Sequence, residues 1–194
     1  MSGTRVTAIV LAGGRSSRFG RDKLAEPFAR GTVLNRAIAA VGPLVHETIA
    51  VAAPDAARRV PDGVILVHDP EPYGGPLVGL LTGLRRATSP VVLLVGGDMP
   101  TMEPSVLGAL LAELADPFIC AAILEHDGWM RPLPGALRAG PALTAVERLV
   151  VAGNRNLRAV YGALVTAAIA ESRWRALDPE GRTLRDIDTP ADLG

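Results

Sequence analysis

The sequence predicts an α/β fold, a single domain over residues 1–194 in which helices cover both faces of a mainly parallel, mixed sheet, giving three layers. Short apolar runs rich in β-branched residues alternate with segments of helical spacing along most of the chain. The runs are nearly continuous in hydrophobicity, which is typical of strands buried on both faces of a parallel sheet. Glycine and proline fall mostly between these elements rather than in one linker.

The first strand is expected over residues 4–11, a run rich in β-branched residues that Gly13 and Gly14 close. The next element is a helix over residues 32–41, where apolar residues recur at helical spacing. It ends at Gly42-Pro43, a pair that cannot easily continue a helix.

Two further strands are expected over residues 48–52 and 64–67, where short apolar runs recur. A helix follows over residues 77–87, and the chain enters it through Gly74-Gly75-Pro76. Proline is favoured at the first turn of a helix because its missing N–H has no partner there.

The strongest strand signal is the unbroken apolar run at residues 90–95. A helix is expected over residues 104–114, again with proline in its first turn. Residues 118–124 predict another buried strand, in which Cys120, the single cysteine, would be a packed core thiol. Beyond this strand the pattern assigns no element with certainty.

Charged residues follow several of these strands. A glycine-rich loop ending at Lys23 follows the first, Asp69 the third and Asp98 the fourth, and a C-terminal Asp-Ile-Asp offers Asp186 and Asp188. Ligands of open α/β sheets bind beyond the carboxyl ends of the strands. Positive groups and carboxylates at one edge would suit a nucleotide phosphate with a divalent metal.

Lys23 is the one lysine among 20 basic residues. Its ammonium is a compact point charge, whereas the guanidinium used everywhere else in the chain is a planar fork. Retention of the point charge beside a glycine-rich loop suggests a phosphate contact. The alternative is that one lysine simply falls in a surface loop.

Composition excludes several classes of function. The net charge is zero and aromatic residues make up 4%, so neither a basic nucleic-acid-binding face nor a base-stacking surface is expected. No apolar run reaches transmembrane length, and the N-terminus carries no secretion signal. We expect no nucleic-acid partner, no membrane partner and a cytoplasmic location, while the sequence carries no indication of an oligomeric state.

The glycine-rich loop lacks both the Gly-Lys-Ser/Thr ending of a Walker loop and the Gly-x-Gly-x-x-Gly spacing of a dinucleotide fold. Its full run, Leu-Ala-Gly-Gly-Arg-Ser-Ser-Arg-Phe-Gly-Arg-Asp-Lys, resembles the signature of the molybdenum cofactor guanylyltransferases, the MobA-like group of NTP transferases. The further segments that resemble this family, in matching order, are 75–80, 97–100, 127–128, 131–134, 153–158 and 186–193.

The resemblance implies a Rossmann-like nucleotidyltransferase fold and the transfer of GMP from GTP to molybdopterin, with Mg²⁺ as cofactor. It implies that Lys23, Asp98 and Arg18 act in catalysis and that Asp98 and Asp188 bind the metal. Further nucleotide contacts would come from Leu11, Ala12, Gly13, Gly14 and Asp69, the last of these at the guanosine.

Structural roles remain open for several of these residues. Asp98 could cap the helix near Pro104, Asp69 could be a turn residue before Pro70, and Arg18 could be a solvent-facing charge. Asp186 competes with Asp188 for the metal, on the expectation that the two face opposite ways in an Asp-Ile-Asp strand end. Asp188 could instead cap a last helix after Thr189-Pro190.

Two departures from the family pattern occur: Gly97 stands in place of a cysteine, which should be harmless, and residues 51–53 lack an asparagine that some members use near the base. Within the enzyme class, CTP or another phosphate acceptor such as phospholactate or a sugar phosphate stays possible. A non-catalytic nucleotide-binding regulator is the alternative from another class.

Overall fold

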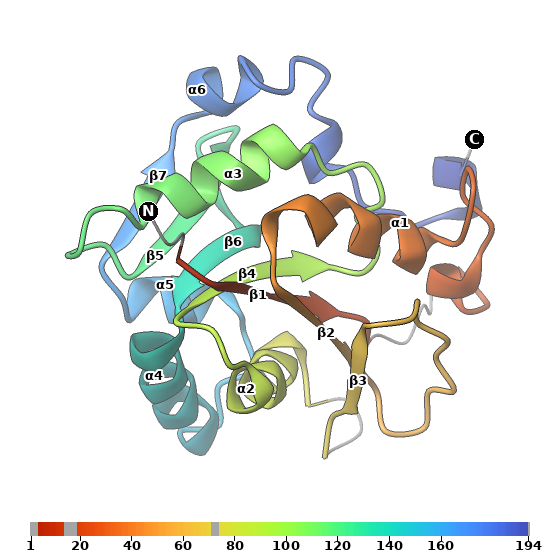
Figure 1. The fold of residues 1–194 in the computed structure, drawn as a ribbon, viewed down its shortest axis with the longest axis horizontal. Coiled ribbons are helices and arrows are strands. Elements are labelled where there is room, and N and C mark those ends of the chain that lie inside the picture. Colours follow the sequence, from red (N-terminus) through yellow and green to blue (C-terminus); the bar gives the residue numbers. More distant parts are fainter. Residues whose placement is uncertain (1–3, 14–18, 71–73, 194) are drawn as a thin grey trace.

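The computed structural model describes residues 4–13, 19–70 and 74–193, which build one seven-stranded sheet in the order β3-β2-β1-β4-β6-β5-β7 (Figure 1). The strands are β1 (Val6–Leu11), β2 (Glu47–Ala52), β3 (Ile65–His68), β4 (Val91–Gly96), β5 (Ala121–His126), β6 (Trp129–Arg138) and β7 (Thr166–Ile169). Only β6 runs antiparallel to its neighbours, β4 and β5, while the other pairs are parallel. The predicted mainly parallel, mixed sheet is confirmed.

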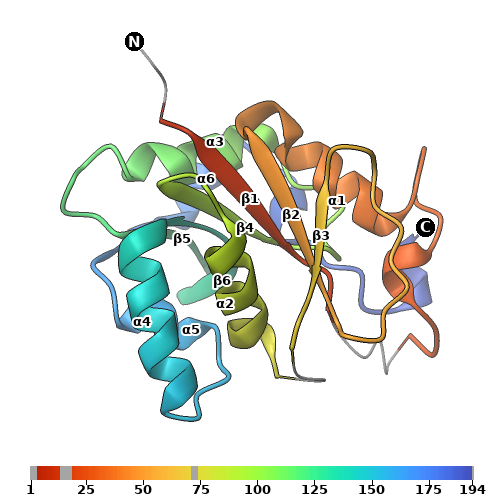
Figure 2. The same ribbon diagram turned by 60° about the horizontal axis from the view of Figure 1, so that its bottom comes forward.

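Helices cover both faces of this sheet (Figures 1 and 2). The α-helices are α1 (Val33–Val41), α2 (Pro76–Arg86), α3 (Pro104–Glu113), α4 (Ala139–Val151), α5 (Arg158–Gly162) and α6 (Glu171–Arg175). The 3₁₀ helices are η1 (Lys23–Ala25), η2 (Gly42–Leu44), η3 (Arg182–Leu184) and η4 (Pro190–Leu193). One core cluster forms under α1, α3 and α6, and a second under α2, α4 and α5, which gives the three layers that the sequence predicts.

The predicted elements up to α3 are all present, with ends within a few residues of those expected. The strand expected over residues 118–124 is displaced, because β5 begins at Ala121. Phe118 is 79% exposed, and Cys120 is half-buried just before the strand rather than packed in the core. The expectation that Asp186 and Asp188 face opposite ways in a strand end was wrong, because neither residue lies in a strand, and residues two apart in a strand would share a face.

The longest strand that the sequence pattern left unassigned is β6, which forms a hairpin with β5. Prolines at positions 132 and 134 lie inside β6, and proline normally argues against a strand because it cannot donate to the ladder. The structure accommodates them at a register shift, where Ile123 pairs with Gly135 but Leu124 pairs with Arg131. The Asp127-Gly128 turn, with φ of 52° and 74°, is a hairpin signal that could have located both strands.

The topology brings the site together at one edge of the sheet. The carboxyl ends of β1 to β4 meet there, and β5 runs parallel to β4 because both are antiparallel to β6. The turn between β5 and β6 therefore lies at the same edge. In the parts of the chain that the structure describes, no helix has the length and hydropathy needed to span a membrane.

Candidate functional site

Lys23 lies between two carboxylates at this sheet edge. Its Nζ is 2.8 Å from Asp98 Oδ2 and 3.1 Å from Asp188 Oδ1. The lysine side chain is 15% exposed, while those of Asp98 and Asp188 are 30% and 45% exposed, so the cluster is shielded on the lysine side and open on the carboxylate side. The structure thus brings together three residues that are 75 and 90 positions apart in the chain.

Asp98 is fixed by the turn that follows β4. The N–H of Gly97 donates to the carbonyl of Leu11 at 2.9 Å, and the carbonyl of Asp98 accepts from the N–H of Ile187 at 2.9 Å. A Cβ at Gly96 would lie 2.5 Å from Asp98 Oδ1, so this position needs glycine to leave room for the carboxylate. Asp98 is therefore held by both β1 and the C-terminal segment, and it does not cap α3, whose N-terminus has no side-chain cap.

Gly97 itself packs tightly. A Cβ there would lie 3.0 Å from Leu34 Cδ1 and 3.1 Å from the carbonyl oxygen of Leu11. A cysteine at this position would require its neighbours to move by a few tenths of an ångström, so in this chain the glycine is matched to its surroundings.

The C-terminal segment presents Asp188 to Lys23 without a strand. Ile187 is buried, and the N–H groups of Asp188 and Thr189 both donate to Asp192 Oδ2, at 3.0 and 2.7 Å. Asp192, not Asp188, therefore provides the capping carboxylate for the last turn. The pKa of Asp186 is raised by partial desolvation and by the charges of Asp188 and Asp98, so Asp186 lies within electrostatic range of the cluster.

The electrostatics of Lys23 follow from these contacts. Partial burial favours the neutral amine, but hydrogen bonds and charges from Asp98, and then from Asp188, outweigh it and raise the pKa of Lys23. The ammonium is thus stably charged at neutral pH. Lys23 is the first residue of η1. The carboxylate of Asp22 caps this short helix by accepting a hydrogen bond from the N–H of Leu24 at 3.1 Å.

The glycine-rich segment is described at its two ends. Leu11 at the end of β1 lies opposite Gly96 of β4 in the parallel pair. The N–H of Ala12 donates to the carbonyl of Val51 at 2.7 Å. A Cβ at Gly13 would meet only Ala53 N at 3.5 Å and more distant atoms, so the fold itself leaves space there. Gly14 and Arg18, like Arg15, lie outside the described residues.

Arg58 is a residue of this site that sequence reasoning missed. Its Nε donates to the carbonyl of Ala12 at 3.1 Å, and its Nη1 pairs with the carboxylate of Asp22. It comes from the connection between β2 and β3, which has no helix or strand of its own. Nothing in the local sequence distinguishes it from Arg59, because the signal is the long-range contact.

Asp69 follows β3, and its N–H donates to the carbonyl of Ala52 at 2.9 Å. Its Oδ1 is buried and has no hydrogen-bond partner among the described residues. Burial raises the pKa of Asp69, and a hydrogen bond from Thr82 opposes this only in part. The Asp69 carboxylate therefore lies between helix α2 and the ends of β1 and β2, with one oxygen that lacks a hydrogen-bond donor among the described residues. Such an oxygen is a candidate for accepting a hydrogen bond from an N–H group of a ligand.

The N-terminus of α2 is packed against the loop that precedes α5. Gly75 has φ of 84°, and a Cβ there would lie 3.2 Å from the carbonyl oxygen of Arg155. Glycine is therefore required both by the backbone conformation and by the close approach. The segments 75–80 and 153–158, both singled out in the sequence, meet here.

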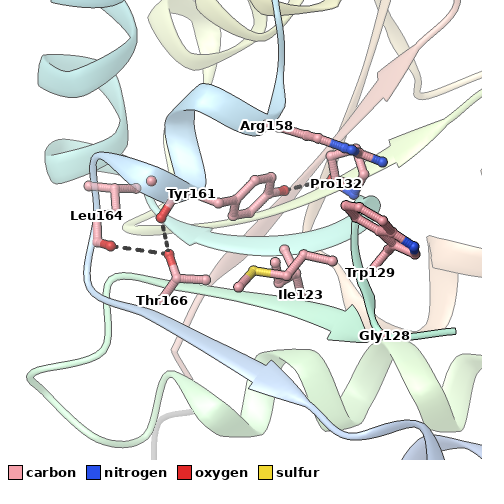
Figure 3. A pocket seen from close by; sticks show the side chains of 10 residues that line it. Ile123, Gly128, Trp129, Pro132, Arg158, Tyr161, Leu164 and Thr166 are labelled. Carbon is pink, nitrogen blue, oxygen red and sulfur yellow. Dashed lines mark hydrogen bonds between the residues drawn. The ribbon is translucent and has the colours of Figure 1, made fainter. Parts of the chain in front are cut away.

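A cavity of ≈ 510 Å³ opens beside the β5–β6 hairpin (Figure 3). Among the residues lining it are Trp129 and Met130 of β6, with exposures of 67% and 56%, and Arg158 and Tyr161 of α5. The Tyr161 hydroxyl donates to the carbonyl of Pro132 at 2.8 Å, which ties α5 to the bulged part of β6. The 3₁₀ helix η3, which leads to Asp186 and Asp188, also packs against β6. Strand β6 therefore contacts the cavity and also the C-terminal segment that leads to Asp188.

Histidine, aspartate and glutamate also meet at the tip of this hairpin. His126 Nδ1 lies 2.8 Å from Glu171 Oε1, and Glu171 Oε2 accepts the N–H of Asp127 at 2.9 Å. His126, Asp127 and Glu171 could share a metal ion by distance. The guanidinium of Arg175 lies 3.2 Å from the same glutamate and supplies positive charge already, so this group is better explained as a tie between the turn and α6.

The chain matches the family model of the MobA-like NTP transferase domain over residues 8–168. A probable molybdenum cofactor guanylyltransferase from Chloroflexus aggregans is 36% identical to it, over 97% of this chain and 91% of the relative. A molybdenum cofactor guanylyltransferase from Desulfosudis oleivorans is 30% identical, over 97% and 92%.

Solved structures show the same fold. Molybdopterin-guanine dinucleotide biosynthesis protein A from Archaeoglobus fulgidus superposes with a TM-score of 0.79 at 22% identity, over 96% of this chain and 94% of that one. The 2-C-methyl-D-erythritol 4-phosphate cytidylyltransferase from Thermus thermophilus reaches 0.68 at 16% identity, over 95% and 94%.

Proposed function

Because the chain belongs to the MobA-like NTP transferase family, we propose that it transfers GMP from GTP to the phosphate of molybdenum-loaded molybdopterin and releases pyrophosphate. Relatives named molybdenum cofactor guanylyltransferase, which align over nearly the whole chain, support this reaction. The single observation that carries the proposal within the structure is the ammonium of Lys23 between Asp98 and Asp188.

Mg²⁺ is the proposed cofactor, and the residues present fit it. Asp98 and Asp188 both reach one ammonium nitrogen, so their oxygens are close enough to share one cation. Carboxylates with phosphate oxygens are the usual ligands of Mg²⁺ at nucleotide sites. Bound there, the ion would neutralise charge on the phosphates and orient them.

The chain's own residues would act by position and charge. An oxygen of the acceptor phosphate attacks the α-phosphorus of GTP, a new P–O bond forms, and the bond to the β-phosphate oxygen breaks. The acceptor phosphate is already ionised, so no strong general base is needed. Lys23 would donate to phosphate oxygens as negative charge moves toward the leaving pyrophosphate. Positioning of the two reactants would supply much of the remaining acceleration.

We propose that the nucleotide lies over Gly13 and the N-terminus of α2. Gly13, which lies within reach of the Asp69 carboxylate, and the Oδ1 of Asp69, which has no hydrogen-bond partner among the described residues, favour this placement. A carboxylate can accept from both the N1–H and the exocyclic amine of guanine, which adenine does not offer together. The N–H of Ala12 already donates to Val51, and its carbonyl already accepts from Arg58. A nucleotide could therefore contact Ala12 by donating to the second lone pair of that carbonyl.

We propose the cavity beside β6 as the region that takes the ring system of the acceptor. It combines an exposed indole at Trp129 with the guanidinium of Arg158, a pairing suited to a flat, polar heterocycle. Because β6 also contacts η3, which leads to Asp188, an acceptor bound there would extend its phosphate toward the cluster. The cytoplasmic location and the absence of nucleic-acid partners stay predictions.

A cytidylyltransferase is the second candidate, because enzymes that use CTP share this fold. Thermal unfolding with GTP, CTP, ATP and UTP, each with and without Mg²⁺, separates the candidates. A ligand at a hundred times its Kd stabilises by about 2.7 kcal/mol, which for this length is roughly 5–11 °C in Tm. A shift that is selective for GTP and needs Mg²⁺ supports the proposal. A CTP-selective shift favours the second candidate, and no shift with any nucleotide contradicts both.

A further inference from the structure

Arg58 is an almost buried cation in a connection that is otherwise largely exposed. Its side chain is 8% exposed, and the residues around it form no helix or strand. A buried arginine is expected to have specific partners, because an unpaired charge is costly to desolvate. Its two partners are the carbonyl of Ala12 and the carboxylate of Asp22.

These partners stand at the two ends of the glycine-rich segment. Ala12 directly follows β1, and Asp22 directly precedes η1. One guanidinium therefore connects the residue that follows β1 to the residue that precedes η1. Arginine suits this task better than lysine, because its planar group directs several N–H donors to separate acceptors at once.

The contact continues to Lys23. Asp22 uses one carboxylate oxygen for Arg58 and the other for the N–H of Leu24, which caps η1. Lys23 is the first residue of that short helix, and its Nζ reaches Asp98 and Asp188. Arg58 thus fixes the orientation of Asp22, and Asp22 fixes the backbone from which the lysine side chain extends.

We infer that Arg58 is a positioning residue for nucleotidyl transfer, which closes the base of the glycine-rich segment and sets the place of Lys23. This inference rests on the proposed function for its catalytic meaning, but the link from Arg58 to Lys23 has a readout of its own. The effect of Arg58 would pass through Asp22 and the backbone of η1.

The chain's single lysine gives that readout. Protein labelled with ¹³C at lysine Cε, with any purification tag removed, yields one ε-methylene signal, which belongs to Lys23. Arg58→Met is expected to shift or broaden this signal at fixed pH and to lower kcat/KM for GTP by about 10- to 100-fold, as expected for a misplaced catalytic group. The exposed neighbour Arg59 is the matched control, and Arg59→Met should leave both the signal and kcat/KM unchanged.

Two further variants keep the test decisive if Arg58→Met folds poorly. Arg58→Lys keeps the charge but replaces the planar guanidinium, whose Nε and Nη1 contact separate partners, by a single nitrogen, so a smaller change in the same direction is expected. Asp22→Asn keeps an oxygen to cap η1 but removes the charge that pairs with Arg58, and it should also move the Lys23 signal.

An unchanged Lys23 signal in all three variants overturns the inference, even if Tm falls, because the contact would then only stabilise the fold. An altered signal with unaltered kcat/KM overturns the catalytic role. An altered signal in a protein whose wild type uses no nucleotide supports the link to Lys23 and instead contradicts the proposed function.

Discussion

Single residues at this site are held in place by contacts from distant parts of the chain. Lys23 keeps Asp98 and Asp188 together, although two carboxylates that close would repel one another without a cation between them. Asp98 is anchored through the backbone of β1 and of the C-terminal segment. Asp98 and Lys23 could be singled out from the sequence, because one follows a predicted strand and the other a glycine-rich loop, whereas Asp188 was indicated by the resemblance of the C-terminal segment to the family.

Substitution of Lys23 should affect turnover far more than folding. Lys23→Gln removes the positive charge that would meet the phosphates, and loss of one preorganised electrostatic contact typically costs about 10²–10³ in kcat. The free energy of unfolding should change little, since both carboxylates keep access to water. Pyrophosphate release and urea unfolding measure the two effects. Unchanged kcat/KM in Lys23→Gln would contradict the assigned role.

Asp69 should make stability depend on pH in a defined direction. Burial raises the pKa of the Asp69 carboxyl in the folded state above the ordinary value of 3.8. At a pH between 3.8 and this raised pKa, the folded state holds a proton that the unfolded state has lost. The free energy of unfolding therefore falls as pH rises through this window. Asp69→Asn should gain stability relative to wild type over the same window and keep the gain at neutral pH. Urea unfolding of both proteins from pH 3 to 7 tests this prediction. If the free energies of unfolding of Asp69→Asn and wild type change with pH in the same way, the prediction is contradicted.

At the scale of elements, α2 lies close to the centre of the sheet because its buried face carries glycine. A Cβ at Gly83 would lie 2.6 Å from Ile9 Cγ2 on β1, whereas a Cβ at Gly108 on α3 has nothing within 4 Å. These two helical glycines form a matched pair for testing the packing.

Gly83→Ala should destabilise the protein by about 1–3 kcal/mol, the usual cost of overpacking a core. Gly108→Ala should stabilise it by about 0.5–1 kcal/mol, because alanine loses less backbone entropy in a helix. Chemical unfolding of the two variants beside wild type measures both changes. Equal effects in the two variants would mean that α2 does not approach β1 as closely as described.

The β5–β6 hairpin carries the proposed acceptor region, and Trp129 is its most exposed large side chain. Trp129→Ala should raise KM for the molybdopterin acceptor about 2- to 10-fold, since an aromatic contact contributes about 0.5–1.5 kcal/mol. The Kd for GTP should stay the same. Phe118→Ala, at the opposite end of β5, is the control for loss of an exposed aromatic ring. An equal KM for the acceptor in Trp129→Ala and wild type would remove this cavity from the proposal.

The elements differ in how well the sequence predicted them, for physical reasons. Strands β1 and β4 are buried along almost their whole length, so their apolar runs are unambiguous, whereas β3, at the sheet edge, is only half-buried and was recognised from a short apolar run. Strand β6 tolerates two prolines only because its pairing with β5 shifts register, a long-range event that local pattern does not reveal. Arg58 and the tie between His126 and Glu171 could not be predicted for the same reason, since each depends on residues brought together by folding.

For the whole molecule, the parallel strands place the carboxyl ends of β1, β3 and β4 together, and with them Gly13, Asp69 and Asp98. Strand β5 runs toward the same edge, where the chain turns into the antiparallel β6. A nucleotide site and an acceptor site can thus face one another across the end of one sheet. This arrangement suits direct transfer between two bound substrates.

The most direct test of guanylyl transfer follows the label of α-³²P-GTP in the presence of Mg²⁺ and molybdenum-loaded molybdopterin. The expected result is label in a guanine dinucleotide product with an equal amount of pyrophosphate released, and loss of both in Lys23→Gln and Asp98→Asn. CTP should give no comparable product. Label that stays in GTP with this acceptor, in protein that is folded and binds GTP, would contradict guanylyl transfer to molybdopterin.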